Sequence, residues 1–340
     1  MANRYWILGT GTWDASTTTH WSTSSGGSGG ASVPGTSDTA IFDANSGGGT
    51  VTTSSASAVG GLTMTGAASM TFSGDLTVQG AITLSSTVTF SSGTITQSGA
   101  GAKNLTFSGA TLYGYDCAQG TVTLQDAFSS SSTFTVSGGT FDANNKNVDF
   151  GGFSSTGSTT RTITMGSGTW STTASSPWTI SGTNCTLNCN TSQLNISKSS
   201  TGTIALGDKT YYNVNLNPNS GTPVLSITGS NTFNNLSVTA SQIGSGGMGI
   251  KFDASSTNTF TTFSVSGYTS SKNVSITSSS GGTAGTLSAA SGTITCYNLS
   301  IQDSAATGGA VWQAISSTDV SGNSGWIFRS NLSGMFEVFN

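Results

Sequence analysis

The sequence predicts an all-β fold, a single-chain parallel β-helix (solenoid) with coils of about 22 residues and capped ends. Three observations lead to this prediction. A five-residue word of fixed apolar pattern recurs along the chain, short segments alternate apolar and polar residues, and charged residues make up only 6% of the composition. Together they indicate short stacked strands in place of helices.

The recurring word consists of two small or polar residues followed by an apolar, a polar and an apolar residue. It starts at residues 60, 103 and 146, each start 43 residues after the last, and again at residues 212, 234, 272 and 297. The later starts follow at gaps of 66, 22, 38 and 25 residues. Most gaps lie near multiples of about 22, with 38 the poor fit, and such a period is typical of a stacked solenoid.

Alternating apolar residues carry the strand prediction. Pairs such as Leu76 and Val78, or Ile82 and Leu84, stand two positions apart, as on one face of a half-buried strand. No window has the sustained apolar spacing of an amphipathic helix, and Glu337 is the only glutamate in the chain. Compositions rich in Ser, Thr and Gly also occur in disordered chains, but those chains lack the β-branched and aromatic residues present here.

Residues 1–50 are predicted to form an aromatic N-terminal cap. Trp6, Trp13 and Trp21 are three of the seven tryptophans, and a Gly/Ser stretch follows them at residues 22–30. The first coil of a solenoid exposes unpaired backbone and an apolar core, so a cap is needed there, and large aromatic side chains suit that role. The alternative is an aromatic ligand groove formed by the same tryptophans.

Residues 51–310 are predicted to form the β-helix itself. Apolar strand words fall about every six residues, and three strands with their Gly/Ser turns make a coil of roughly 20 to 24 residues. About 12 coils are expected on a three-sided helix, right-handed by the general preference of parallel crossovers. The alternative fold is a string of β-sandwiches, which also use short, evenly spaced strands.

The recurring word often contains an asparagine, for which we expect a structural role. Asparagine tolerates left-handed backbone and bonds its neighbours, so the expected arrangement is a hydrogen-bonded ladder at one corner of the coils. The residues concerned are Asn104, Asn147, Asn213, Asn235, Asn273 and Asn298.

Residues 311–340 are predicted to form a closing coil and an apolar docking segment. Trp312 and the words around residues 319–328 indicate a final coil with its own plug. The last residues are more apolar than a free tail should be, so we expect them to fold back as a cap or to dock on another subunit. The docking residues are Met335, Phe336, Val338 and Phe339.

The positions of the carboxylates in the sequence do not indicate a catalytic site. The thirteen are thinly spread, and the nearest pairs are Asp116 with Asp126 and Asp142 with Asp149. Glycoside hydrolysis needs two carboxyl groups about 5–10 Å apart, which Asp142 and Asp149 would have to reach across a turn. Aspartates in turns usually bond their own backbone, so we expect no catalytic residue and no enzyme activity.

The cysteines are predicted to be small core side chains. Cys185 and Cys189 share the parity of one strand face with Leu187. A zinc site would need two further ligands, and the single histidine, His20, is far away in sequence. No metal and no cofactor are therefore expected.

Charge and hydropathy restrict the expected partners. The formal net charge is −4 and the nine basic residues are scattered singly, so nucleic acid is not an expected partner. No apolar run is long enough to span a membrane or to act as a secretory signal, so neither membrane association nor signal-directed export is expected.

Short words at the two ends of the chain carry a family resemblance. They stand at residues 9–14, 21–22, 33–34 and 42–44 near the start, and at residues 303–305, 308–312 and 322–328 near the end. The first set, opening with Gly-Thr-Gly-Thr-Trp-Asp, resembles the beginning of β-helical virion surface proteins of tailed phages, and the second is similar to their ends. The Ser/Thr/Gly-rich middle is similar to that of autotransporter-like bacterial surface proteins. No catalytic residue carries over.

The resemblance implies a structural bacteriophage protein on the virion surface, either a capsid decoration or head fibre or a tail fibre, without catalysis. The partners it implies are other virion proteins, with a homotrimer as the expected assembly and a host-surface glycan as a further ligand. The alternative is a bacterial surface adhesin or carbohydrate-binding module, which the lack of a recognisable secretion signal disfavours. A third hypothesis, a polysaccharide-degrading tailspike, requires a carboxylate pair in a groove.

Overall fold

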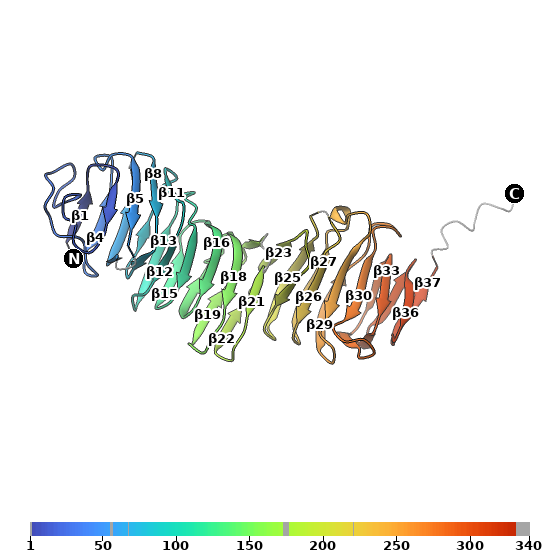
Figure 1. Ribbon diagram of the computed structural model, residues 1–340. Coiled ribbons are helices and arrows are strands. Elements are labelled where there is room, and N and C mark those ends of the chain that lie inside the picture. Colours follow the sequence, from blue (N-terminus) through green and yellow to red (C-terminus); the bar gives the residue numbers. More distant parts are fainter. Residues whose placement is uncertain (1, 55–56, 67, 173–176, 220, 331–340) are drawn as a thin grey trace. The chain divides into compact units, whose positions relative to one another are not determined.

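The computed structural model describes residues 2–330 except residues 55–56, 67, 173–176 and 220. The chain divides into two compact units. Unit 1 comprises Met1–Trp170 and Gly182–Asn188, and unit 2 comprises Ser171–Ser181 and Cys189–Asn340. Each unit is a parallel β-solenoid whose strands stack coil upon coil (Figure 1). Together they contain about 12 turns with a spacing near 22 residues, which confirms the predicted fold class.

Unit 1 has three faces of stacked strands. The longest is a ten-stranded sheet in the order β3 (Trp21–Ser22), β1 (Asn3–Trp6), β4 (Thr39–Phe42), β7 (Gly61–Met64), β10 (Ile82–Thr83), β13 (Ala102–Thr106), β15 (Thr121–Leu124), β17 (Gly139–Asp142), β19 (Arg161–Thr164) and β22 (Cys185–Asn188). The second contains β2 (Gly11–Trp13), β5 (Gly49–Thr53), β8 (Met70–Ser73) and β11 (Val88–Phe90). The third contains β6 (Ala58–Val59), β9 (Leu76–Val78), β12 (Thr94–Gln97), β14 (Gly114–Cys117), β16 (Phe128–Val136) and β18 (Val148–Ser155). Strand β20 (Thr169–Thr172) contains the residue at which the two units divide.

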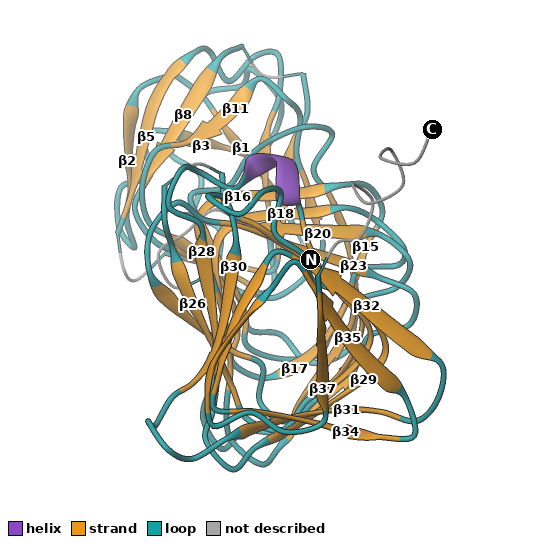
Figure 2. Ribbon diagram, turned by 90° about the vertical axis from the view of Figure 1, so that its right-hand side faces the viewer, coloured by secondary structure: helices purple, strands orange, loops and turns teal. Residues whose placement is uncertain are grey.

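Unit 2 repeats this arrangement. One face contains β21 (Trp178–Ile180), β24 (Gly202–Ala205), β26 (Val224–Thr228), β28 (Met248–Phe252), β30 (Val274–Ser278), β33 (Leu299–Gln302) and β36 (Thr318–Ser321). A second set contains β23 (Gln193–Ser197), β25 (Thr210–Asn217), β27 (Thr232–Val238), β29 (Thr257–Ser264), β31 (Gly285–Ala289) and β34 (Ser304–Gly308). A separate sheet contains β32 (Thr293–Tyr297), β35 (Val311–Ile315) and β37 (Trp326–Arg329). Figure 2 shows β28 and β30 on one face and β29, β31 and β34 on another. A single 3₁₀ turn, Ala240–Gln242, is the one helical element in the described residues.

Strand direction excludes the alternative fold. Every pair whose register the described residues fix is parallel, except β1 with β3, which is antiparallel. Sandwiches are built from antiparallel sheets, so the prediction of the solenoid is right and the sandwich alternative is wrong. The antiparallel β3 covers the outer edge of β1, where an unpaired strand would otherwise be exposed.

Alternation along the strands builds the core. In β9 and β25 apolar residues face inward while the Thr or Asn residues between them face outward. Inward aromatic rings stack from coil to coil, for example Tyr211 on Phe233 and Phe233 on Phe260, the latter with ring centroids 5.3 Å apart. Each fully buried ring stabilises the fold by about 1.5–3 kcal/mol, so stability is spread over many coils.

Coil length varies more than the repeat indicates. Leu105 pairs with Leu124, a coil of 19 residues, whereas Asn258 pairs with Leu287, a coil of 29. Both Leu62 and Leu105 lie opposite Ile82, so the first 43-residue spacing spans two coils. The word at residue 146 does not continue this stack, because its Val148 pairs with Phe128 on a different face.

Candidate functional site

Several aspartates in the two units bind the backbone of a neighbouring coil. Asp126 accepts hydrogen bonds from the N–H groups of Phe107, at 2.8 Å, and Ser108. Adjacent coils lie about 4.8 Å apart, so a carboxylate at one turn reaches N–H groups of the next. The same contact is made by Asp75, Asp208, Asp253 and Asp303. These carboxylates are therefore part of the scaffold.

The two aspartate pairs considered for catalysis do not form an acid–base site. Asp142 accepts a hydrogen bond from the N–H of Asn144 at 2.8 Å, which makes a local turn. Asp149 lies on the exposed side of β18. Asp116 is half-buried and accepts from the Ser137 hydroxyl at 2.8 and 2.9 Å, and its burial raises the pKa of its carboxyl above the ordinary value. None of these groups lines the groove described below.

The cysteines are free thiols. Cys117, Cys185 and Cys296 are buried, whereas Cys189 is partly exposed. The alternation around Cys185 follows the predicted parity, since Thr186 is exposed and Leu187 is more buried. Burial raises the pKa of the Cys117 and Cys296 thiols to about 12. Within the described residues, no group of three or more His, Cys, Asp or Glu side chains is arranged to hold a metal ion.

The three N-terminal tryptophans meet inside the first coils of unit 1. Trp6, Trp13 and Trp21 are all 0% exposed, and the Trp21 ring makes edge contacts with Trp6 at 5.1 Å and Trp13 at 5.0 Å. The His20 ring stacks on Trp6 at 4.7 Å. The burial of all three rings fits a packed plug. Trp13 also lines a hollow of about 300 Å³, together with residues 14–15, 33–36 and 57–58.

The asparagines of the recurring word lie on several faces, so the expected single ladder is wrong. Asn104 lies on the exposed side of β13, and Asn147 accepts a hydrogen bond from the N–H of Thr169 at 3.0 Å. Within unit 2, two pairs of words do stack in register: Asn213 lies opposite Asn235 on β25 and β27, while Asn273 and Asn298 precede the paired strands β30 and β33.

Short local ladders replace the single ladder. Asn234 donates to the side-chain oxygen of Asn213 at 3.1 Å. The side-chain oxygen of Asn235 accepts from the hydroxyls of Thr262 at 2.9 Å and Ser264 at 3.0 Å on the next coil. These asparagines therefore form hydrogen bonds between adjacent coils where a hydroxyl or amide group of the neighbouring coil lies opposite them.

Two inward cations of unit 1 were not anticipated from the sequence. Arg161 is 0% exposed and donates to the Ser155 hydroxyl at 2.7 Å, the Thr159 carbonyl at 2.8 Å and the Gly157 carbonyl at 3.0 Å. The Lys103 ammonium donates to backbone carbonyls, including that of Gln119 at 3.1 Å, and burial lowers its pKa. Both side chains thus donate hydrogen bonds to backbone carbonyl groups that lie outside the strand pairs.

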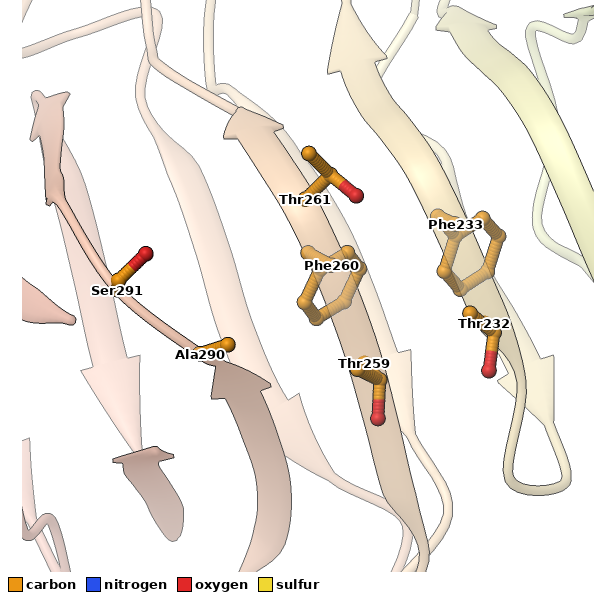
Figure 3. A pocket seen from close by; sticks show the side chains of 7 residues that line it. All are labelled: Thr232, Phe233, Thr259, Phe260, Thr261, Ala290 and Ser291. Atoms are coloured by element: carbon orange, nitrogen blue, oxygen red, sulfur yellow. The ribbon is translucent and has the colours of Figure 1, made fainter. Parts of the chain in front are cut away.

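The strongest candidate for a binding site is a break in one face of unit 2. There β27 pairs with β29 from Thr259 to Ser264, with Leu236 opposite Phe263. Among the described strands, the next strand on that face, β32, pairs with β35 and not with β29. The first half of β29 pairs with β31 as far as Phe260 and Ala289, after which the chain leaves β29 (Figure 3). Two strand edges are therefore left facing one another.

A groove of about 600 Å³ lies between these edges, and we call it the β29/β32 groove. Residues 261–264 and 266 line one wall and residues 291–295 and 297 line the other. It adjoins a smaller hollow of about 200 Å³, with which it shares Thr261 and Ser291 (Figure 3). The walls consist mainly of Ser and Thr and contain no charged residue.

The floor and the closed end of the β29/β32 groove are well defined. Phe263 and Ile294 are buried beneath it, and the Trp312 ring lies 5.6 Å from Phe263. At the closed end, the backbone of Tyr297 accepts from the N–H of Gly267 at 2.8 Å and donates to the Ser266 hydroxyl. The coil that contains the break has 29 residues. The only sign of the groove in the sequence is therefore this unusually long distance between successive strands of one face.

The predicted docking residues Met335, Phe336, Val338 and Phe339 lie outside the described residues. No helix in the described part of the chain is long and apolar enough to cross a membrane. Comparison of the chain with protein-family models, with curated proteins and with solved structures finds no match.

Proposed function

We propose that the protein is a structural, non-catalytic component of the surface of a tailed-bacteriophage particle, as a capsid decoration, head fibre or tail fibre. The main support for this proposal is the position of the short sequence words, near the two ends of the chain, that resemble those of phage β-helical proteins. Trp13 and Trp21 belong to the N-terminal plug, and Trp312 packs on Trp326 in the last described coil at 5.2 Å. The words that resemble those of such proteins lie in the first and last described coils, where the solenoid needs caps.

Two further observations support a non-catalytic role. Several carboxylates are held in hydrogen bonds between coils, as Asp126 and Asp208 are. The β29/β32 groove has no charged residue in its lining, and a hydrolase of glycosides needs two carboxyl groups there.

Immunogold labelling of purified phage particles with antibody to this chain tests the proposal. Label on heads is expected for a decoration or head fibre, and label on tails for a tail fibre. Particles that carry no label, while other virion proteins are labelled normally, would overturn the proposal. Light scattering of the purified protein measures whether the expected homotrimer forms.

A carbohydrate-binding module or adhesin is the second candidate, because exposed tyrosines flank the groove. Tyr297 is 45% exposed at its closed end, and Tyr268, in the adjoining turn, is 58% exposed. An aromatic ring beside hydroxyl-lined walls suits a sugar, which presents both apolar and polar surface. Glycan binding that is lost in Tyr297→Ala and kept in Tyr113→Ala, an exposed tyrosine of unit 1, would favour this candidate.

A further inference from the structure

We propose that the hydroxyl of Ser266 holds the β29/β32 groove open by taking the place of a backbone hydrogen-bond acceptor, so that β29 and β32 do not pair. This inference does not rest on the proposed function, since it concerns why the stacking of strands stops at this position. Ser266 is then a positioning residue, and backbone groups along the edge of β32 stay available to a ligand.

Parallel strand pairs in unit 2 follow a fixed pattern of hydrogen bonds. Val274 on β30 lies opposite Leu299 on β33, and its N–H donates to the C=O of the preceding residue, Asn298, at 3.2 Å. In a parallel ladder, the C=O of the same residue accepts from the residue that follows the opposite one. A residue that faces a neighbouring strand therefore bonds to the two residues on either side of its opposite residue.

At the closed end of the β29/β32 groove this pattern begins and is then diverted. The N–H of Gly267 donates to the C=O of Tyr297 at 2.8 Å, so Tyr297 lies opposite Ser266. The pattern then requires the N–H of Tyr297 to donate to the C=O of Val265. The Tyr297 N–H donates to the Ser266 hydroxyl at 3.1 Å, so this hydroxyl occupies the position of the second bond of the ladder.

The backbone groups that would continue the ladder point into the groove. On the other side of β32, the C=O of Gly292 accepts from β35 at 2.9 Å and the N–H of Asn298 donates to β35 at 3.1 Å. Even-numbered residues of β32 therefore direct their backbone groups to β35, and Thr293 and Thr295 direct theirs to β29. Among the described strands, none pairs with this edge of β32.

The two strands are close enough to pair. Cα atoms of β29 and β32 come within 8 Å of each other. Paired strands lie about 4.8 Å apart, so a shift of about 3 Å would bring the nearest parts into pairing distance. Without the Ser266 hydroxyl, the acceptor that the register offers to the Tyr297 N–H is the C=O of Val265. Forming that bond would align the N–H of Thr295 with the C=O of Phe263 as the next bond of the ladder.

Hydrogen–deuterium exchange of the full chain, resolved to single amides, tests the proposal. In the wild-type protein, the Thr293 and Thr295 amides should exchange fast, and those of Ile294 and Cys296, which face β35, should exchange slowly. In Ser266→Ala, exchange of the Thr295 amide should slow about tenfold or more, because β29 and β32 then pair. Continued slow exchange of Cys296 shows that the variant is folded.

Three further variants separate the role of the hydroxyl from a general effect of mutation. Ser266→Thr keeps a hydroxyl, so its Thr295 amide should exchange as fast as in the wild type. Ser264→Ala removes a hydroxyl that donates to Asn235 on the preceding coil, and Thr295 should again exchange fast. Ser266→Cys, whose thiol is a weak acceptor, should slow Thr295 as Ser266→Ala does, which provides a second test if the alanine variant does not fold.

Two results would overturn the proposal. Exchange of Thr295 that is as fast in Ser266→Ala and Ser266→Cys as in the wild type would mean that the hydroxyl does not keep the strands apart. Slow exchange of Thr295 already in the wild type would mean that this edge of β32 is not open.

Discussion

Replacing Trp21 by alanine should destabilise the N-terminal end of unit 1 by about 3–5 kcal/mol. The side chain is 0% exposed, and truncating a buried tryptophan costs about this much through lost burial and the cavity left behind. Its edge contacts with Trp6 and Trp13 contribute about 0.5–1.5 kcal/mol each to that total. The Trp21 indole N–H has no hydrogen-bond partner, so its removal offsets part of the loss.

The assay combines guanidinium unfolding with hydrogen exchange. In a solenoid each coil contacts only its neighbours, so the effect should be local. Amides of β1, β4 and β7 should exchange faster in Trp21→Ala, while those of β15 and β17 should not change. The control Trp21→Phe keeps a ring and removes the unpartnered N–H, and a smaller loss of about 1–2 kcal/mol is expected.

A loss below about 1 kcal/mol in Trp21→Ala would refute this reasoning, because a fully buried tryptophan that closes the core cannot be so dispensable. Equal acceleration of exchange in β15 and β17 would also contradict it. That result would show that the plug stabilises unit 1 as one cooperative body and not its first coils.

Three further predictions concern buried polar groups. Arg161→Met should lower the free energy of unfolding by about 3 kcal/mol or more, measured by guanidinium unfolding, because it leaves the buried carbonyl and hydroxyl of Ser155 without this donor. Asp116→Asn should stabilise the protein at pH 7, since burial raises the pKa of the folded carboxyl and the wild type loses stability as pH rises through that pKa. A thiol reagent at pH 8 should modify Cys189 in the folded protein, and all four thiols only after unfolding.

Each of these has its own control. Arg329→Met removes an exposed arginine, so its effect should be within about 0.5 kcal/mol. The advantage of Asp116→Asn should vanish below the ordinary carboxyl pKa of 3.8, where the wild-type group is protonated in both states, and a constant advantage at every pH would contradict the assignment. Rapid labelling of Cys117, whose thiol pKa burial raises to about 12, would show that the core of unit 1 opens readily.

The alternation of apolar and polar residues made it possible to predict which side chains face the core. Leu76 and Val78 are buried on β9, with Thr77 between them less buried, because a strand turns successive residues to opposite sides. The word repeat was a reliable guide only where two coils have ordinary lengths, as from Leu62 to Leu105. It failed at Val148, since loop lengths change which face a given spacing reaches.

The contacts between coils could not be predicted from the sequence. The partner of Asp126 is the backbone of Phe107 on another coil, and it depends on a register that neither residue encodes locally. Arg161 is a single charged residue among Ser and Thr, and no periodic pattern distinguishes an inward corner arginine from an exposed one. Such contacts can be identified only after the register between neighbouring coils is known.

The low content of charged residues and the break between β29 and β32 can be explained together. In a solenoid, polar side chains form hydrogen bonds between neighbouring coils, as the Thr262 hydroxyl does with the side-chain oxygen of Asn235. Such bonds between uncharged groups can join the coils without ion pairs. The stacking is interrupted between β29 and β32, which lie near one another without forming a strand pair. Departures from a fold's own local rules are expected where function or assembly requires them. The β29/β32 groove is therefore the position in the described part of unit 2 where we expect a ligand to bind.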